Sequence, residues 1–228
     1  MKFISEEILI NEGDFSSSDS YIIIHKEIMD AVESTRWPPG SDKFTINPGE
    51  RGERHPNGVL PIKFEFVEYL YNAGWLLEQK LNIAVRVKPG PIDLVKPVGN
   101  QFFAVEWETG NISSSHRALN KMAIGIGEGT LVGGALVLPS RNLYKYLTDR
   151  IGNYEEILPY FPMYKLMKPA NGILTVVVVE HDELSKAVPK IPKGTDGYGL
   201  GSEDPTGFRS IKERKNKYKV NKQGKLFE

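Results

Sequence analysis

Three acidic residues lie close together in the middle of the chain: Asp93 in the run PID, and Glu106 and Glu108 in the run VEWE. In a β-strand, residues two apart share a face, so Glu106 and Glu108 would lie side by side. Neighbouring carboxylates repel each other unless a cation, water or a shared proton compensates. Mg²⁺ takes one or two carboxylates together with waters and substrate phosphates. The spacing therefore indicates a metal site suited to phosphodiester hydrolysis, although ordinary acids on an exposed sheet edge would give the same pattern.

Polar residues that could contact nucleic acid follow directly after these acids. Asn111, Ser113 and Arg117 fall at the expected start of a helix, and helix N-termini favour anions. Asn, Ser and Arg side chains are also able to read the edges of bases. The alternative is that Asn111 and Ser113 are turn and capping residues and that Arg117 is a solvated side chain, and these residues alone favour that alternative.

The elements that must position these residues are predicted from hydrophobic periodicity and from turn residues. Helices are expected over 20–35, 61–82, 113–127 and 140–150, and strands within 83–96 and over 101–109, 131–139 and 173–180. Ser113 or Ser114 is the expected N-cap of the third helix. Strands that alternate with helices predict an α/β fold with a central mixed sheet, and irregular structure is expected from residue 185 onward.

The composition is that of an ordinary globular protein, with 228 residues, 40% hydrophobic and 25% charged. The absence of cysteine excludes disulfides and cysteine-bound metals. No apolar run approaches the ~20 residues of a membrane span, and the first residues lack the apolar core of a signal peptide. These features predict a cytoplasmic protein that does not bind membranes.

The formal net charge is zero, but the charge is unevenly distributed. Residues 209–225 contain eight basic residues and one acidic residue, whereas residues 1–208 contain 21 basic and 27 acidic residues. A basic terminal segment of this kind either binds phosphate groups or is simply solvated, and its composition alone favours neither.

The run VEWETGNISSSHRALNK at 105–121 resembles the catalytic strand and recognition helix of the BamHI family of type II restriction endonucleases. Further blocks resemble the family in the same order and together span about two-thirds of the chain. They are FTINPGERGERHPNGVLPIK at 44–63, KPGPIDLVK at 88–96, YLTDRIGNYEEILPYF at 146–161, VPKIPKGTDG at 188–197 and RSIKERKNK at 209–217.

The resemblance implies a restriction-endonuclease-like fold, in which helices flank the central mixed sheet. It implies a single nuclease domain over 1–228, with an irregular basic segment at about 198–228. The implied activity is Mg²⁺-dependent double-strand cleavage of DNA at a palindromic six-base site by a homodimer, as part of a restriction-modification system. Because the alignable specificity residues are unchanged, the site implied is GGATCC.

The resemblance also assigns the active-site residues. Asp93, Glu106 and Glu108 match the acids of a PD…ExK nuclease site, with Glu108 where most relatives place lysine. All three would bind the metal, the backbone carbonyl of Trp107 would face it, and Glu108 would be the candidate general base. Glu78 matches a further acid near the site.

Residues that would contact DNA carry over in the same way. Asn111, Ser113 and Arg117 match the recognition helix, and Asp149 with Arg150 match a pair that would read one G·C base pair. The remaining matched DNA-binding positions are Lys63 and Asp196.

Two departures from the family pattern concern the dimer and the C-terminal region. At the dimer interface the family's charge order is inverted, so Glu128 and Lys165 are expected to pair between subunits. About ten residues are inserted around 198–208, and the tail is longer.

Two functions other than site-specific cleavage of DNA are compatible with parts of this sequence. One is a DNA-binding protein on the same scaffold that no longer cleaves, which the intact acids disfavour. The other is a metal phosphodiesterase for small substrates, which the base-reading residues disfavour.

Overall fold

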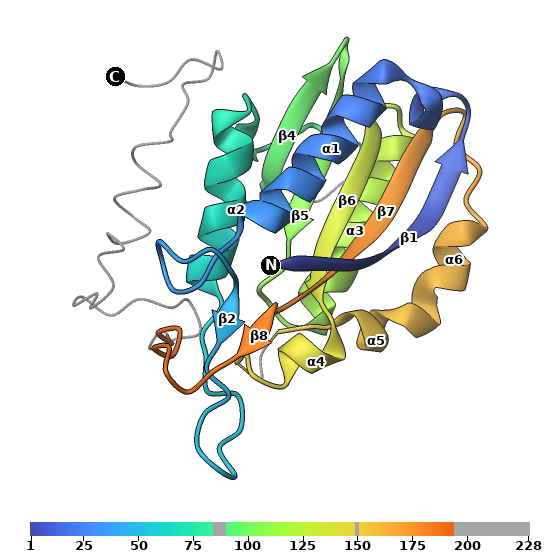
Figure 1. Ribbon diagram of the computed structural model, residues 1–228. Helices are drawn as coiled ribbons and strands as arrows, with labels where there is room; N and C mark the ends of the chain where they lie inside the picture. Colours follow the sequence, from blue (N-terminus) through green and yellow to red (C-terminus); the bar gives the residue numbers. More distant parts are fainter. Residues whose placement is uncertain (84–89, 149–150, 194–228) are drawn as a thin grey trace.

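The computed structural model describes residues 1–83, 90–148 and 151–193, which are built around a six-stranded sheet (Figure 1). The strand order is β1–β7–β6–β5–β4–β3. Strands β5, β6 and β7 are parallel, whereas β1, β4 and β3 join antiparallel to their neighbours. The strands are β1 Lys2–Glu12, β3 Leu76–Gln79, β4 Ile92–Val98, β5 Gln101–Trp107, β6 Leu131–Pro139 and β7 Gly172–Glu180. The sheet is therefore mixed, as predicted.

Helices cover both faces of this sheet and create two hydrophobic cores. Helices α1 (Asp19–Ser34) and α2 (Leu60–Asn72) form one core with the sheet, and α3 (Ile112–Gly127) and α6 (Phe161–Lys165) contribute to the other (Figure 1). The smaller elements are η1 Phe15–Ser17, α4 Arg141–Tyr144, α5 Tyr154–Ile157, η2 Leu158–Tyr160, and the parallel pair of β2 Thr45–Ile46 with β8 Glu183–Leu184. No helix in the described ranges is long and apolar enough to cross a membrane.

The two central strands, β6 and β7, are buried almost throughout, which explains their continuous apolar sequences. Close packing at their centre requires glycine in β6. A Cβ atom on Gly133 would lie 2.5 Å from the Phe103 ring, and one on Gly134 would lie 2.7 Å from Met122 Sδ. The small residues thus allow β5 and α3 to approach the sheet centre.

The predicted helix over 61–82 is wrong beyond Asn72. Gly74 adopts a φ of +88°, a left-handed conformation that ends helices, and the chain then turns back into the sheet. Leu76 and Leu77, which fall inside the predicted helix, instead pair with Val95 and Leu94 as part of β3. The apolar run after Gly74 therefore belongs to a strand rather than to the helix.

Other boundaries also differ from the prediction. Strand β5 ends at Trp107 rather than 109, and the helix predicted over 140–150 is reduced to α4. The N-cap of α3 is Asn111, whose side chain accepts a hydrogen bond from the Ser114 N–H, rather than Ser113 or Ser114. Strand β1 was not predicted, because its charged residues obscure the alternating pattern. Residues 185–193 contain no helix or strand, as expected.

Candidate active site

Two of the predicted acids meet at the lower end of the sheet in Figure 1, where β4 begins and β5 ends. Leu94 pairs with Val105, so in this antiparallel ladder Asp93 stands beside Glu106. The Asp93 N–H donates a hydrogen bond to Glu106 Oε2 at 3.2 Å. The Trp107 N–H donates to Asp93 Oδ2 at 3.0 Å. Backbone groups of both strands therefore fix the two carboxylates next to each other.

Each of these carboxylates binds a lysine, and the two lysines come from opposite faces of the sheet. Lys63, in the first turn of α2, lies with its Nζ 2.7 Å from Asp93 Oδ1. Lys121 of α3 lies with its Nζ 2.5 Å from Glu106 Oε1 and also donates to the Pro91 carbonyl at 3.0 Å. Lys121 was not among the predicted site residues, although its position one helical turn after Arg117 places it on α3 near the acids.

The electrostatics of the cluster follow from its burial. Burial, and secondarily the charge of Asp93, raise the pKa of Glu106 to about 7, against the opposing charges of Lys121 and Lys63. Burial also raises the pKa of Glu108. For Lys63, burial lowers the pKa, but the charge and hydrogen bond of Asp93 outweigh it, so that its pKa is raised. Burial thus disfavours the charged forms of both Glu106 and Glu108.

Glu108 lies just beyond the end of β5, so the two-residue alternation that was expected to align it with Glu106 does not reach it. Its backbone N–H still donates to the Val137 carbonyl at 3.3 Å. Its side chain turns to the loop before α3, where Oε1 accepts a hydrogen bond from the Gly110 N–H at 2.5 Å. A Cβ atom on Gly110 would lie 2.7 Å from Ser114 Oγ and 2.8 Å from that Glu108 oxygen, so a side chain at this position would displace these groups.

The structure places Glu78 on the edge strand beside Asp93. Its neighbours Leu77 and Gln79 pair with Leu94 and Ile92, which sets the Glu78 backbone opposite Asp93. Glu78 is exposed and has a φ of +47°, an unusual conformation for a residue other than glycine. Trp107 is buried, and its ring packs 4.8 Å from that of Phe66 on α2.

The carboxylates of the site offer oxygen ligands to a divalent metal. Within the described ranges, no three His, Asp or Glu side chains are arranged to hold an ion together. The adjacent carboxylates of Asp93 and Glu106 nevertheless match the needs of Mg²⁺, which binds one or two carboxylates and completes its shell with water and phosphate. Two lysine ammonium groups already neutralise these carboxylates. The donor set therefore fits Mg²⁺, provided that a lysine can be displaced.

The predicted DNA-reading residues of α3 lie together on its exposed first turns. Asn111 caps the helix, Ser113 is exposed, and Arg117 Nη2 donates to Ser114 Oγ at 3.1 Å. The Gly152 N–H donates to the Gly110 carbonyl at 2.8 Å, which holds the chain that follows residue 150 against the start of α3. Asp149, Arg150 and Asp196, like the 198–208 insertion and the basic tail, lie outside the described residues.

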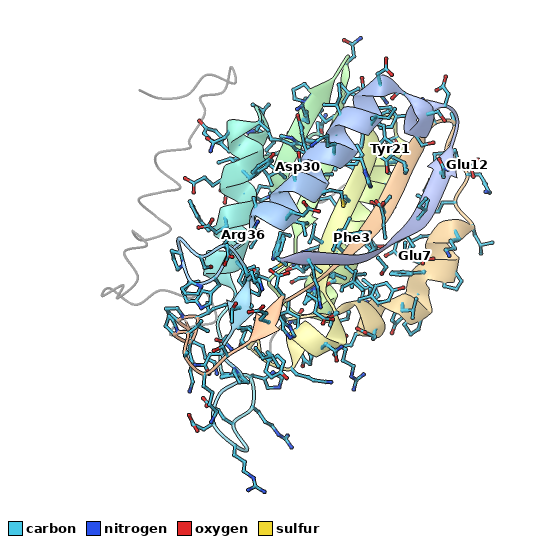
Figure 2. All side chains as sticks on the ribbon, in the orientation of Figure 1. Phe3, Glu7, Glu12, Tyr21, Asp30 and Arg36 are labelled. Atoms are coloured by element: carbon cyan, nitrogen blue, oxygen red, sulfur yellow. The ribbon has the colours of Figure 1, made fainter. Side chains whose placement is uncertain are left out.

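The two residues predicted at the dimer interface lie at the ends of neighbouring helices. Glu128 is the exposed C-cap of α3. Lys165, at the end of α6, forms an ion pair of 2.5 Å with Glu7 of β1, and Lys168 pairs in the same way with Glu12. Figure 2 shows Glu7 and Glu12 along this edge strand. Exposed apolar side chains on α3, η2, α6 and its C-cap are Ile124, Leu158, Tyr160, Met163 and Leu166, and others lie on β1 and α1, namely Phe3, Ile4, Ile8, Ile22 and Ile23.

Known proteins match the chain in sequence and in fold. A family model described as "Restriction endonuclease BamHI" matches residues 1–198. The type II restriction enzyme OkrAI of Oceanobacter kriegii is 47% identical over 200 residues, covering 88% of this chain and 100% of OkrAI. The type II restriction enzyme BamHI of Bacillus amyloliquefaciens is 34% identical over 225 residues, covering 94% of this chain and 97% of BamHI.

The fold is also similar to that in a crystal structure of the restriction endonuclease BglII complexed with a DNA 16-mer. The TM-score is 0.51 at 10% identity, over 78% of this chain and 79% of that one. The predicted restriction-endonuclease-like fold and the predicted family are both confirmed. The chain therefore belongs to the BamHI family of type II restriction endonucleases, which are metal-dependent, DNA-binding, site-specific deoxyribonucleases.

Proposed function

We propose that this chain cuts both strands of DNA at GGATCC, with Mg²⁺ as its metal, as a homodimer in a bacterial restriction-modification system. Residues 1–228 would form one nuclease domain acting in the cytoplasm. The observation that carries the proposal is the Asp93–Glu106 carboxylate pair, joined through backbone hydrogen bonds at the end of the sheet. The exposed polar start of α3, at the N-cap Asn111, follows five residues after Glu106, so metal-binding and base-reading groups lie at one end of the fold.

Asp93 and Glu106, with the Trp107 carbonyl, would hold the metal. When bound there, Mg²⁺ supplies activation of the attacking water and stabilisation of the leaving oxygen. Glu108 would also contact the metal or act as the general base, since burial raises its pKa and the Gly110 N–H fixes its orientation. Glu78 lies on the edge strand β3, opposite Asp93 of β4, and would add a further negative charge near the metal site.

Sequence reading is assigned to the exposed first turns of α3 and to the segments that resemble the family's other contacts. Asn111, Ser113 and Arg117 would face the major groove. Arg150 could bond bidentately to guanine while Asp149 accepts from cytosine, and together they would read one G·C pair. The remaining proposed contacts are Lys63 and Asp196.

A two-fold dimer is proposed because a palindrome presents the same half-site twice. The exposed apolar side chains of α3, η2 and α6 support an interface on that face. Tyr164 donates to Asn120 Oδ1 at 2.8 Å, which ties α6 to α3. Lys165 would then exchange its intramolecular contact with Glu7 for Glu128 of the partner subunit, a pair that adds roughly 0–1 kcal/mol and chiefly selects partners.

The proposal is tested by digesting a sequenced plasmid with and without Mg²⁺ and mapping the ends. Cuts at GGATCC that require Mg²⁺ are expected, and cuts elsewhere would refute the proposed specificity. The variants Asp93→Asn and Glu106→Lys should not cleave but should still shift a GGATCC duplex, because both reduce repulsion of phosphate. If the unaltered protein shifts the duplex without cutting it, the chain is a DNA-binding protein that has lost cleavage.

A further inference from the structure

Lys63 forms an ion pair with Asp93, one of the two carboxylates that fit the metal. Its Nζ lies 2.7 Å from Asp93, and both side chains are mostly buried, with 23% and 20% of their surface exposed. The Lys63 Nζ lies 2.7 Å from each of the two Asp93 oxygens, and Oδ2 also accepts a hydrogen bond from the Trp107 N–H. A divalent cation that binds Asp93 must therefore compete with the lysine ammonium for the same carboxylate.

Lys63 is held less firmly than the second lysine of the cluster. Lys121 bonds both Glu106 and the Pro91 carbonyl, and only 9% of its side chain is exposed. Among the described residues, Asp93 is the one hydrogen-bond partner of the Lys63 ammonium. Lys63 can consequently leave its position by giving up a single partner, whereas Lys121 would leave a carboxylate and a backbone carbonyl together.

A phosphate group is a suitable alternative partner for Lys63. The residue lies in the first turn of α2, where the helix dipole favours anions. An ammonium on a flexible four-carbon chain can rotate from a carboxylate to a phosphate without moving the backbone. The same end of the sheet carries the exposed start of α3, so DNA bound to α3 would bring phosphates towards Lys63.

We propose that Lys63 is an exchangeable counter-ion, which occupies Asp93 in the DNA-free protein and is drawn away by a DNA phosphate, so that Asp93 becomes free for the metal. This inference rests on the proposed metal-dependent cleavage at Asp93 and Glu106. Lys63 would act as a positioning residue for the metal site. Its consequence is a positive coupling: DNA binding strengthens metal binding by removing the competing ammonium, and metal binding strengthens DNA binding by the same factor.

The experiment measures Ca²⁺ binding by isothermal titration calorimetry, for the full chain alone and with a duplex containing GGATCC. The variant Lys63→Met removes the charge but keeps most of the apolar stem. We expect it to bind Ca²⁺ about tenfold or more tightly than the unaltered chain without DNA, because a competing unit charge is gone. Addition of the duplex should then raise the Ca²⁺ affinity of the variant by a smaller factor than it raises that of the unaltered chain. The DNA phosphates offer oxygen ligands to the metal in both proteins, so the difference between these two increases reports the contribution of Lys63.

Two further variants exclude trivial explanations. Lys63→Arg keeps the charge and should retain the weak Ca²⁺ binding of the unaltered chain; tighter binding by this variant would assign the effect to packing. Lys96→Met is a matched control, because Lys96 has 22% of its side chain exposed and pairs with Glu27 rather than with the acids of the site. Its Ca²⁺ affinity should not change.

An unchanged or weaker Ca²⁺ affinity of folded Lys63→Met, judged by its near-ultraviolet circular dichroism, overturns the inference. If that variant does not fold, Lys63→Gln replaces it under the same criterion. Failure of the proposed function gives a different result, because the unaltered chain would then leave plasmid DNA intact with Mg²⁺ whatever the Ca²⁺ affinities are. The two ideas are therefore separable.

Discussion

Replacing Glu106 by Gln should stabilise the DNA-free, metal-free protein at alkaline pH. Burial and the neighbouring Asp93 raise the pKa of Glu106 from 4.5 to about 7. The folded state therefore binds a proton that the unfolded state has already released. The stability from this proton is fully present below pH 4.5 and is lost as the pH rises through 7. Glutamine mimics the protonated acid at every pH, so the Glu106→Gln variant should escape this loss.

The magnitude follows from the two pKa values. A rise from 4.5 to about 7 corresponds to roughly 3 kcal/mol, at about 1.4 kcal/mol for each tenfold change in proton affinity. The raised value already includes the attraction of Lys121 and Lys63. Lys121 keeps its hydrogen bond to Pro91 in the variant, but loses its carboxylate partner. We therefore expect the free energy of unfolding of the Glu106→Gln variant to exceed that of the unaltered chain by about 2 kcal/mol at pH 8, with little difference at pH 4.5.

The assay is urea unfolding at pH 8 and pH 4.5 with a chelator present. The matched control is Glu27→Gln, because Glu27 also pairs with a lysine, Lys96, and accepts from Trp75 Nε1 at 2.7 Å. The free energy of unfolding of this control should fall by ~1 kcal/mol at pH 8, because the substitution removes a carboxylate that is paired with a lysine. The reasoning is refuted if Glu106→Gln is less stable than the unaltered chain at pH 8, or if its gain is equal at both pH values. Loss of cleavage alongside the gain would mark Glu106 as a residue kept for function at the expense of stability.

Three more changes have defined outcomes. Gly110→Ala should lower the single-turnover cleavage rate about tenfold or more, because its methyl group would collide with the Glu108 carboxylate as well as with the Ser114 hydroxyl; an unchanged rate would remove Glu108 from the proposed chemistry. Deletion of 210–228 should flatten the salt dependence of DNA binding, measured by fluorescence anisotropy, whereas an unchanged slope would identify a merely solvated tail. Lys165→Glu alone should weaken dimerisation in analytical ultracentrifugation, and adding Glu128→Lys should restore it; a single variant that dimerises normally contradicts the proposed pairing.

The fold was predictable where local sequence and tertiary environment agree. The apolar runs of β6 and β7 and the periodic stripes of α1 and α3 each predict the element that forms. Strand β1 has no such signal, because its partner β7 lies more than 150 residues away and supplies the pairing that makes it a strand. The end of α2 was predicted wrongly for a related reason. Leu76 and Leu77 suit either a helix or a strand, and their pairing with β4 determines that they form a strand.

The site was predictable to the same extent. The spacing of the acids brought Asp93 and Glu106 into one hypothesis, and the structure brings them together. The contacts of the two lysines could not be predicted from the sequence. No local pattern shows that helices on opposite faces of the sheet place Lys63 beside one acid and Lys121 beside the other. The family resemblance assigned Lys63 to DNA alone, and its contact with Asp93 depends on how α2 packs against the sheet.

The hydrogen bond between Gly152 and Gly110 constrains how such an enzyme could acquire a new recognition sequence. Gly110 holds Glu108 through its N–H and holds the segment after residue 150 through its carbonyl. The peptide units on the two sides of one glycine thus link the proposed base-reading segment to a proposed catalytic acid. A substitution that shifts the backbone near Gly152 to suit another base would also move Glu108. New specificity would consequently demand compensating changes in two loops at once, which makes gradual divergence of the target site difficult.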